Sequence, residues 1–124
     1  MKSALVVGAG GFFGAIARYL VNLAVLRVWS APFPLGTLVI NVTGSFVLGW
    51  FSTWAAARAG LDPAWRLFVG TGFVGAYTTF STFAFETVRL AEESERGRAL
   101  LNVAVSIVVG VASAAAGFAL ASLG

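Results

Sequence analysis

Four long apolar stretches, almost free of charge, constrain this chain more than any other feature of its sequence. They run roughly over residues 4–26, 35–57, 67–88 and 99–123, and Arg18 and Glu86 are the only charged side chains within them. Each is about 20 residues or longer, enough for an α-helix to cross a hydrocarbon core of about 30 Å. Because no water reaches the backbone there, helices are the expected solution. The sequence therefore predicts an all-α membrane protein in which residues 1–124 form one domain of four transmembrane helices.

The composition agrees with a membrane protein and excludes several functions. Charged residues make up 10% of the chain, against about 25% in a typical soluble domain. The chain has no cysteine and no histidine, which excludes disulfides, thiolate metal sites and catalysis by either side chain. We therefore do not expect an enzyme. The cations lie between the apolar stretches, where they are expected to meet anionic lipid rather than nucleic acid.

The positive charges do not favour one orientation in the membrane. With four crossings, one side holds three cations and the other holds four, namely Lys2, Arg58 and Arg66 against Arg27, Arg89, Arg96 and Arg98. Cations normally accumulate on the cytoplasmic side and so set the orientation. The balance is compatible with insertion in both directions and an antiparallel dimer. It is equally compatible with a small protein that has few charges to count.

The glycines near the N-terminus have the spacing of a dinucleotide-binding motif. Gly8, Gly11 and Gly14 match that pattern, but the motif also needs a preceding strand and an acidic residue about 20 positions later. The first acidic residue here is Asp62. We instead expect Gly10 and Gly14 to form a small-xxx-small step that lets another helix approach closely.

Two sets of small and polar residues recur every four positions and so share a helical face. They are Thr37, Asn41 and Ser45 in the second stretch, and Asn102, Ser106 and Gly110 in the fourth. Such residues either form hydrogen bonds between helices, worth about 0.6 kcal/mol on average, or line a pathway. Asn41 favours a pathway because its amide donors lie near the centre of an uncharged stretch.

The third stretch is the most informative. Three glycines, at positions 70, 72 and 75, precede a run of hydroxyl and aromatic residues over 77–83. This composition weakens a helix in mid-membrane, and a broken membrane helix exposes carbonyls to cations and amides to anions. Phenyl rings have positive edges, which suit a small anion. We expect no acidic side chain deep in the bundle to repel one. The alternative is a packed, phenylalanine-rich helix whose hydroxyls bond to its own backbone.

Three motifs resemble the bacterial Fluc/CrcB family of fluoride channels. They are Gly36–Gly44, Gly72–Phe83 followed by Glu86 and Thr87, and Gly11–Tyr19. The likeness extends over essentially the whole chain in length and in the order of the stretches. The motif in the third stretch is the most specific, whereas the fourth stretch is generic.

The resemblance implies a dual-topology antiparallel homodimer in the bacterial cytoplasmic (inner) membrane. It would export fluoride passively through two pathways lined by both subunits and so protect against fluoride toxicity. The implied pathway residues are the pore-facing Asn41, the ring edges of Phe80 and Phe83, the hydroxyls of Thr37, Ser81 and Thr82, and Arg18 near an aqueous entrance.

The resemblance also implies a structural Na⁺ on the dimer axis. The backbone carbonyls of Gly75 and Thr78 from both subunits would hold it. Glu86 matches a family glutamate to which we assign no role, and some relatives carry tyrosine where this chain has Asn102.

Two other functions compete with a fluoride channel. A small dual-topology multidrug or cation exporter is the first, but proton-coupled exchange needs an ionisable group within the membrane. The first two stretches contain no acid, and we expect Glu86 to lie near a helix end. The second is an accessory membrane protein that binds partners and carries no ions.

Overall fold

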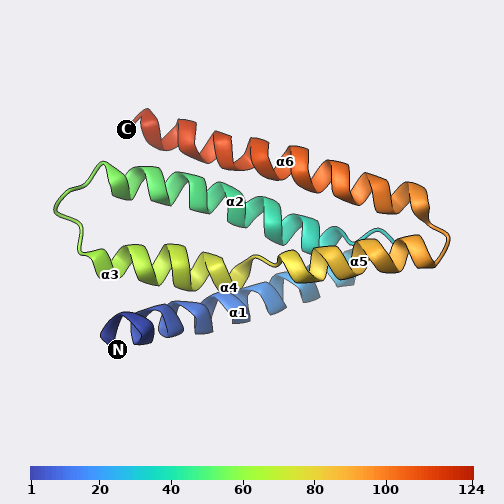
Figure 1. Cartoon of the computed structure of the whole chain (residues 1–124), viewed down its shortest axis with the longest axis horizontal. Helices are drawn as coiled ribbons and strands as arrows, with labels where there is room; N and C mark the ends of the chain where they lie inside the picture. Colours follow the sequence, from blue (N-terminus) through green and yellow to red (C-terminus); the bar gives the residue numbers. More distant parts are fainter.

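A computed structural model describes residues 1–124 as seven helical segments without a strand. Three of them, α1 (Lys2–Val28), α2 (Leu35–Ala56) and α6 (Arg96–Ser122), are long and apolar enough to cross a membrane. Between α2 and α6 lie α3 (Pro63–Trp65), the π-helix η1 (Arg66–Val74), α4 (Gly75–Tyr77) and α5 (Phe80–Glu92). These four segments follow one another along the bundle, as Figure 1 shows. The all-helical prediction is confirmed.

The third helical segment extends beyond the apolar stretch predicted from the sequence at both ends. The segment expected over 67–88 begins at Pro63 and ends at Glu92. Proline suits the first turn of a helix, and the side chain of Asp62 caps this turn by accepting a hydrogen bond from the Ala64 amide at 2.9 Å. At the other end, Arg89 and Glu93 face each other one turn apart, with 3.9 Å between Nε and Oε1. Hydropathy does not detect such polar helix ends.

The third segment is interrupted after the glycines rather than at them. Gly70 and Gly72 lie within η1, and Gly75 begins α4. The chain leaves the helix at Thr78 (φ −79°, ψ 156°) and Thr79 (φ −148°, ψ 109°), both in extended conformations. The predicted break is therefore present at the pair of β-branched threonines, which lose side-chain freedom in a helix.

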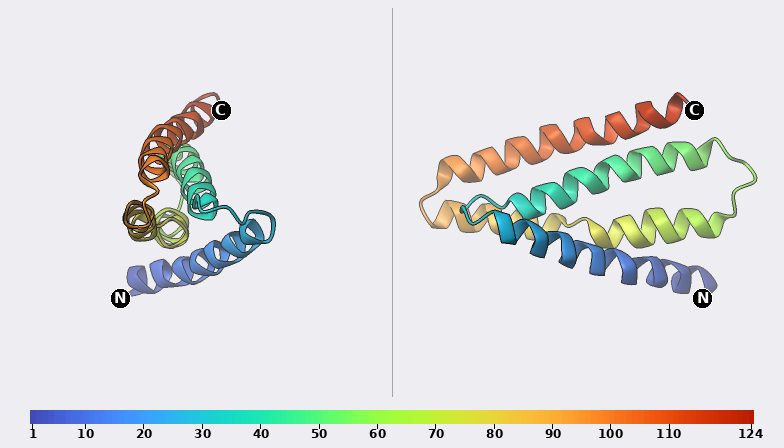
Figure 2. Two further views of the ribbon diagram at one scale, coloured as in Figure 1. Left: turned by 90° about the vertical axis from the view of Figure 1, so that its right-hand side faces the viewer. Right: turned by 180° about the vertical axis from the view of Figure 1, so that it is seen from behind.

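The connections gather at two ends of the bundle. The N-terminus, the C-terminus and the α2–α3 connection lie at one end, and the α1–α2 and α5–α6 connections lie at the other (Figures 1 and 2). α2 packs mainly against α6, whereas α1 packs mainly against η1 and α4. Only 15 of the 124 residues are buried, and large apolar side chains such as Phe12, Leu100 and Val108 face outward. An outward apolar surface of this extent is what a lipid environment requires.

Glycines allow α1 to approach the third segment closely. A Cβ atom at Gly10 would collide with the Phe68 carbonyl, and one at Gly14 would collide with the Phe73 carbonyl. A Cβ atom at Gly72 on η1 would likewise collide with the Val7 carbonyl of α1. The predicted small-xxx-small step is therefore confirmed. The same glycine-rich segment is helical throughout α1, without the strand that a nucleotide-binding motif needs.

Candidate ion pathway at the broken helix

The break in the third segment is capped by Thr79. Its Oγ1 accepts a hydrogen bond from the Thr82 amide at 3.3 Å, and the Thr79 and Thr82 hydroxyls are 2.9 Å apart. Threonine is a favoured residue at the start of a helix because its side chain satisfies an amide that has no helical partner. Ser81 Oγ lies 3.4 Å from the same Thr79 hydroxyl. The first residues of α5 thus present a group of three hydroxyls at the break.

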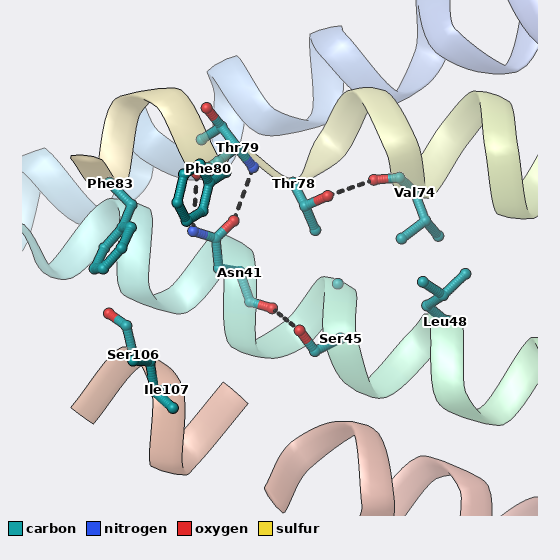
Figure 3. Close-up of a pocket in the computed structure, with 11 residues that line it drawn as sticks. Asn41, Ser45, Leu48, Val74, Thr78, Thr79, Phe80, Phe83, Ser106 and Ile107 are labelled. Atoms are coloured by element: carbon teal, nitrogen blue, oxygen red, sulfur yellow. Dashed lines mark hydrogen bonds between the residues drawn. The ribbon is translucent and has the colours of Figure 1, made fainter. Parts of the chain in front are cut away.

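Asn41 on α2 holds the extended backbone of Thr79. Its Nδ2 donates to the Thr79 carbonyl at 3.0 Å, and its Oδ1 accepts from the Thr79 amide at 2.8 Å, as Figure 3 shows. Thr79 is only 7% exposed, so both groups would otherwise be buried without partners. The pair of bonds explains how an interrupted helix is tolerated inside a membrane. One N–H of the Asn41 amide remains for another acceptor.

A cavity of about 300 Å³ opens beside this clamp. The side chains shown in Figure 3 come from α2, the third segment and α6, and they include the predicted Asn41, Phe80 and Phe83. The two phenyl rings are 5.7 Å apart between centroids and tilted by 52°. Phe80 is 78% exposed in the single chain. The cavity therefore opens onto a face of the chain where the Phe80 side chain is largely exposed.

A second cavity, of about 270 Å³, lies on the other side of Thr79. Arg18, Thr37 and Thr82 from the predicted site line it. Thr79 lines both cavities, whereas Ser81 lines neither. The structure thus divides the predicted pathway residues other than Ser81 between two cavities that share Thr79. Thr37 and Asn41 share a face of α2, but they lie one helical turn apart and line different cavities.

Glu86 corrects two expectations from the sequence. It lies in the middle of α5, not near a helix end, because α5 continues to Glu92. Its Oε1 accepts a hydrogen bond from Thr37 Oγ1 at 3.0 Å, its Oε2 is buried without a hydrogen-bond partner, and its side chain lines the Arg18 cavity. The expectation that no acidic side chain lies within the bundle was therefore wrong. The predicted apolar stretch ends at residue 88, whereas α5 continues to Glu92. Hydropathy therefore placed the helix end too close to Glu86.

Asn102 joins α6 to the phenylalanine segment. It is 2% exposed, and its Nδ2 donates to Thr87 Oγ1 at 2.9 Å. Thr87 in turn donates to the Phe83 carbonyl at 2.8 Å, while Ser106 Oγ donates to Asn102 Oδ1 at 3.4 Å. This chain of bonds links the backbone of a cavity-lining phenylalanine to Ser106, which lines the same cavity. The predicted polar face of α6 therefore contributes through Asn102 and Ser106.

The break also removes the helical donors of the two carbonyls that were assigned to sodium. In a continuous helix, the Thr79 amide would donate to Gly75 and the Thr82 amide to Thr78. Here the Thr79 amide donates to Asn41, and the Thr82 amide donates to the Thr79 hydroxyl. Unwound carbonyls of this kind coordinate Na⁺ in membrane proteins. The carbonyl oxygens of Gly75 and Thr78 are therefore suitable ligands for a monovalent cation.

Sequence reasoning missed three polar residues that line these cavities, namely Tyr19, Asn22 and Thr79. Thr79 had a usable signal, since a threonine just before a helix is a favoured cap. Asn22 lies four positions after Arg18, so the two share a face of α1. Tyr19 had no comparable signal beyond its position next to Arg18.

The chain is similar to known proteins along nearly its whole length. The family model described as CrcB-like protein, Camphor Resistance (CrcB), matches residues 5–118. A relative from Sulfurihydrogenibium sp. (strain YO3AOP1), named Fluoride-specific ion channel FluC, is 42% identical over 123 residues, which cover 99% of each chain. A protein of the same name from Acidobacterium capsulatum is 47% identical over 105 residues, or 85% of this chain and 84% of the relative. Fluoride-specific ion channel FluC 1 from Geobacillus kaustophilus is 45% identical over 111 residues, covering 90% of each.

Proposed function

This chain belongs to the CrcB family, and on that premise we propose that it is a fluoride-selective ion channel of the bacterial cytoplasmic membrane. The relatives are named as ion channels, and the chain has neither histidine nor cysteine. Hydrogen fluoride enters a cell from acidic surroundings and ionises inside, so an exit for the anion prevents its accumulation. The observation that carries the proposal is the Asn41–Thr79 clamp, which places polar donors and phenyl rings around a break in the third segment.

We propose that α3 to α5 together make a fourth membrane crossing. Residues 63–92 run along the length of the bundle beside three helices that can each span a membrane (Figure 1). The interruption at Thr78 and Thr79 explains why no single helix of this segment is long enough by itself. At the interruption, Asn41 bonds to both the amide and the carbonyl of Thr79, which lowers the cost of a broken helix in lipid.

The functional unit in this proposal is an antiparallel homodimer with two pathways. Phe80 is 78% exposed beside the first cavity, so a second copy is needed to enclose an ion there. The nearly equal numbers of cations at the two ends of the bundle support insertion in both directions. Each pathway would then be lined by residues of both subunits.

Selectivity for fluoride would come from replacing its water shell with fixed donors and ring edges. The remaining N–H of Asn41 and the hydroxyls near Thr79 supply hydrogen bonds, while Phe80 and Phe83 supply the positive edges of their rings. Arg18 in the second cavity attracts anions and opposes the repulsion by Glu86 on the wall of the same cavity. No proton transfer or covalent step is required.

A structural sodium ion is part of the same proposal. The carbonyls of Gly75 and Thr78 have lost their helical amide donors, and two antiparallel copies would bring four such oxygens together at the dimer axis. Bound there, the ion would hold the two broken helices in register.

The test is ion efflux from liposomes that contain only the purified protein, followed with fluoride and chloride electrodes. Rapid loss of fluoride with chloride retained supports the channel. Retention of fluoride by liposomes containing verified, folded protein contradicts it. Cysteine labelling of single-cysteine variants at each end, from one side of the vesicle, would establish whether both orientations occur.

The position of Glu86 also provides a test of the alternative function, a small multidrug or cation exporter. A carboxylate in mid-helix, with one oxygen lacking a partner, is the ionisable group that proton-coupled exchange needs. An exporter predicts that an imposed pH gradient drives the uptake of an organic cation and that Glu86→Gln abolishes it. A channel predicts fluoride efflux without a pH gradient.

A further inference from the structure

An aromatic cavity lies at the α2–α3 end of the bundle, away from the broken helix. It measures about 390 Å³, within the size range of small-molecule sites, and only apolar side chains line it: Trp50, Phe51, Trp54, Leu61, Trp65 and Val69. The rings of Trp50 and Trp54 stack at 5.9 Å, and Phe51 stacks on Trp54 at 6.0 Å. Three of the four tryptophans of the chain thus surround one hollow.

Arg58 lies beside this cavity, and Arg66 lines a neighbouring hollow that shares Phe51 with it. The Arg58 guanidinium lies 4.1 Å from the centroid of the Trp54 ring, and its Nη1 donates to the Trp54 carbonyl at 3.0 Å. Arg66 Nη2 donates to the Ala55 carbonyl at 2.9 Å and to the Arg58 carbonyl at 3.4 Å. These bonds hold both guanidiniums in place but use only part of their five N–H donors each.

The arginines at this end lack acidic partners, unlike those at the opposite end. There, Arg89 pairs with Glu93 at 3.9 Å and Arg98 pairs with Glu95 at 2.7 Å. Neither Arg58 nor Arg66 forms an ion pair, and the only nearby acid, Asp62, accepts a bond from the Ala64 amide. The α2–α3 end therefore presents two arginines without ion pairs beside an apolar hollow.

We propose that this end of the bundle binds an anionic phospholipid, with one acyl chain in the tryptophan cavity and the phosphate at Arg58 and Arg66. The cavity lies beside the last two turns of α2, where a spanning helix meets the headgroup region. Tryptophan is common at this depth in any membrane protein, but a general aromatic belt requires neither a shared hollow nor fixed, unpaired arginines. Arginine recognises phosphate through paired donors. The site does not depend on fluoride conduction.

Quenching of tryptophan fluorescence by lipids with brominated acyl chains tests this site in the full-length protein. A Trp29→Phe background removes the tryptophan at the opposite end, so the signal comes from the three cavity tryptophans. The protein is reconstituted in mixtures of phosphatidylglycerol and phosphatidylcholine, with either lipid brominated in turn at the same mole fraction. We expect brominated phosphatidylglycerol to quench more of the tryptophan fluorescence than its mole fraction predicts. Each arginine should favour binding of phosphatidylglycerol over phosphatidylcholine about fivefold.

The variants separate a phosphate site from a general belt. Arg58→Gln and Arg66→Gln should each reduce the preference about fivefold, and 1 M salt should weaken it by screening. Arg27→Gln, which removes a cation at the opposite end, is the matched control and should leave it unchanged. If Arg66→Gln fails to fold, Arg58→Gln suffices, because the side chain of Arg58 donates only to the Trp54 carbonyl, four residues earlier in the chain. Equal quenching by the two lipids, stronger quenching by phosphatidylcholine, or a preference that survives the arginine substitutions would overturn the proposal.

Discussion

Replacement of Asn41 by leucine tests the clamp on the broken helix. Leucine has a similar size, so the change removes hydrogen bonds without opening a large cavity. The Thr79 amide loses its 2.8 Å acceptor and the Thr79 carbonyl loses its 3.0 Å donor. Thr79 is 7% exposed, so neither group reaches bulk solvent directly. We therefore expect the extended conformation at the break to become less populated.

The size of this effect follows from the two lost bonds. Interhelical hydrogen bonds in membranes contribute about 0.6 kcal/mol each, so the pair contributes about 1.2 kcal/mol if water from the adjacent cavity replaces both partners. If the groups stay dry, each unsatisfied group costs at least about 1 kcal/mol. A loss of about 1.2 to 2 kcal/mol lowers the equilibrium constant for the conducting conformation about 7- to 30-fold. We expect the fluoride efflux rate to fall by up to that factor.

The assay is fluoride efflux from liposomes at matched protein density, with dimer content checked by size-exclusion chromatography. Ser45→Ala is the control, since Ser45 lines the same cavity one turn along α2. Its hydroxyl bonds only to the Asn41 carbonyl of its own helix, at 2.6 Å, so its loss should change the rate less than about twofold. Wild-type efflux from folded Asn41→Leu would refute the role of the clamp.

Three further outcomes are expected. Asn41→Asp keeps the acceptor for the Thr79 amide but turns a negative oxygen toward the Thr79 carbonyl and the cavity, so fluoride efflux should fall to near background; an unchanged rate would remove Asn41 from the pathway. Phe80→Ile and Phe83→Ile should each slow efflux at least about tenfold while the dimer stays folded, because they lose the positive ring edges; wild-type rates in both would contradict the ring-edge mechanism. Gly14→Leu should lower the thermal stability in detergent by about 1–3 kcal/mol or more, since a side chain there meets backbone of the third segment. Gly8→Leu, with open space around it, should leave the melting temperature unchanged, and equal melting of the two variants would exclude close packing at Gly14.

Hydropathy and glycine spacing were enough to predict the helical architecture. The membrane requires long apolar helices, so three of the four stretches could be located to within a few residues of α1, α2 and α6. Gly10 and Gly14 lie one turn apart on a single helix, and local spacing therefore predicted their packing. The break was also predictable in outline, because glycines and β-branched residues weaken a helix wherever they cluster.

The details of the site depended on contacts that local patterns do not encode. Asn41 and Thr79 are 38 positions apart in the sequence, and nothing near either residue identifies its partner. Glu86 was misplaced for a different reason, since polar residues extend α5 beyond the apolar stretch through pairing along the helix. The division of the pathway residues into two cavities likewise follows from the break, which changes the direction of every side chain after Thr79.

A single side chain therefore accounts for both kinds of ion site in the proposed channel. By accepting from the Thr79 amide, Asn41 takes away the donor that would have bonded to the Gly75 carbonyl, which leaves that oxygen free for a cation. By donating to the Thr79 carbonyl, it keeps the backbone extended, so that α5 starts anew with its amides and hydroxyls facing the break. A continuous helix would consume the carbonyls and the amides in bonds to each other. The proposed sodium and fluoride sites are consequently two results of one interruption, and a change at Asn41 is expected to affect both.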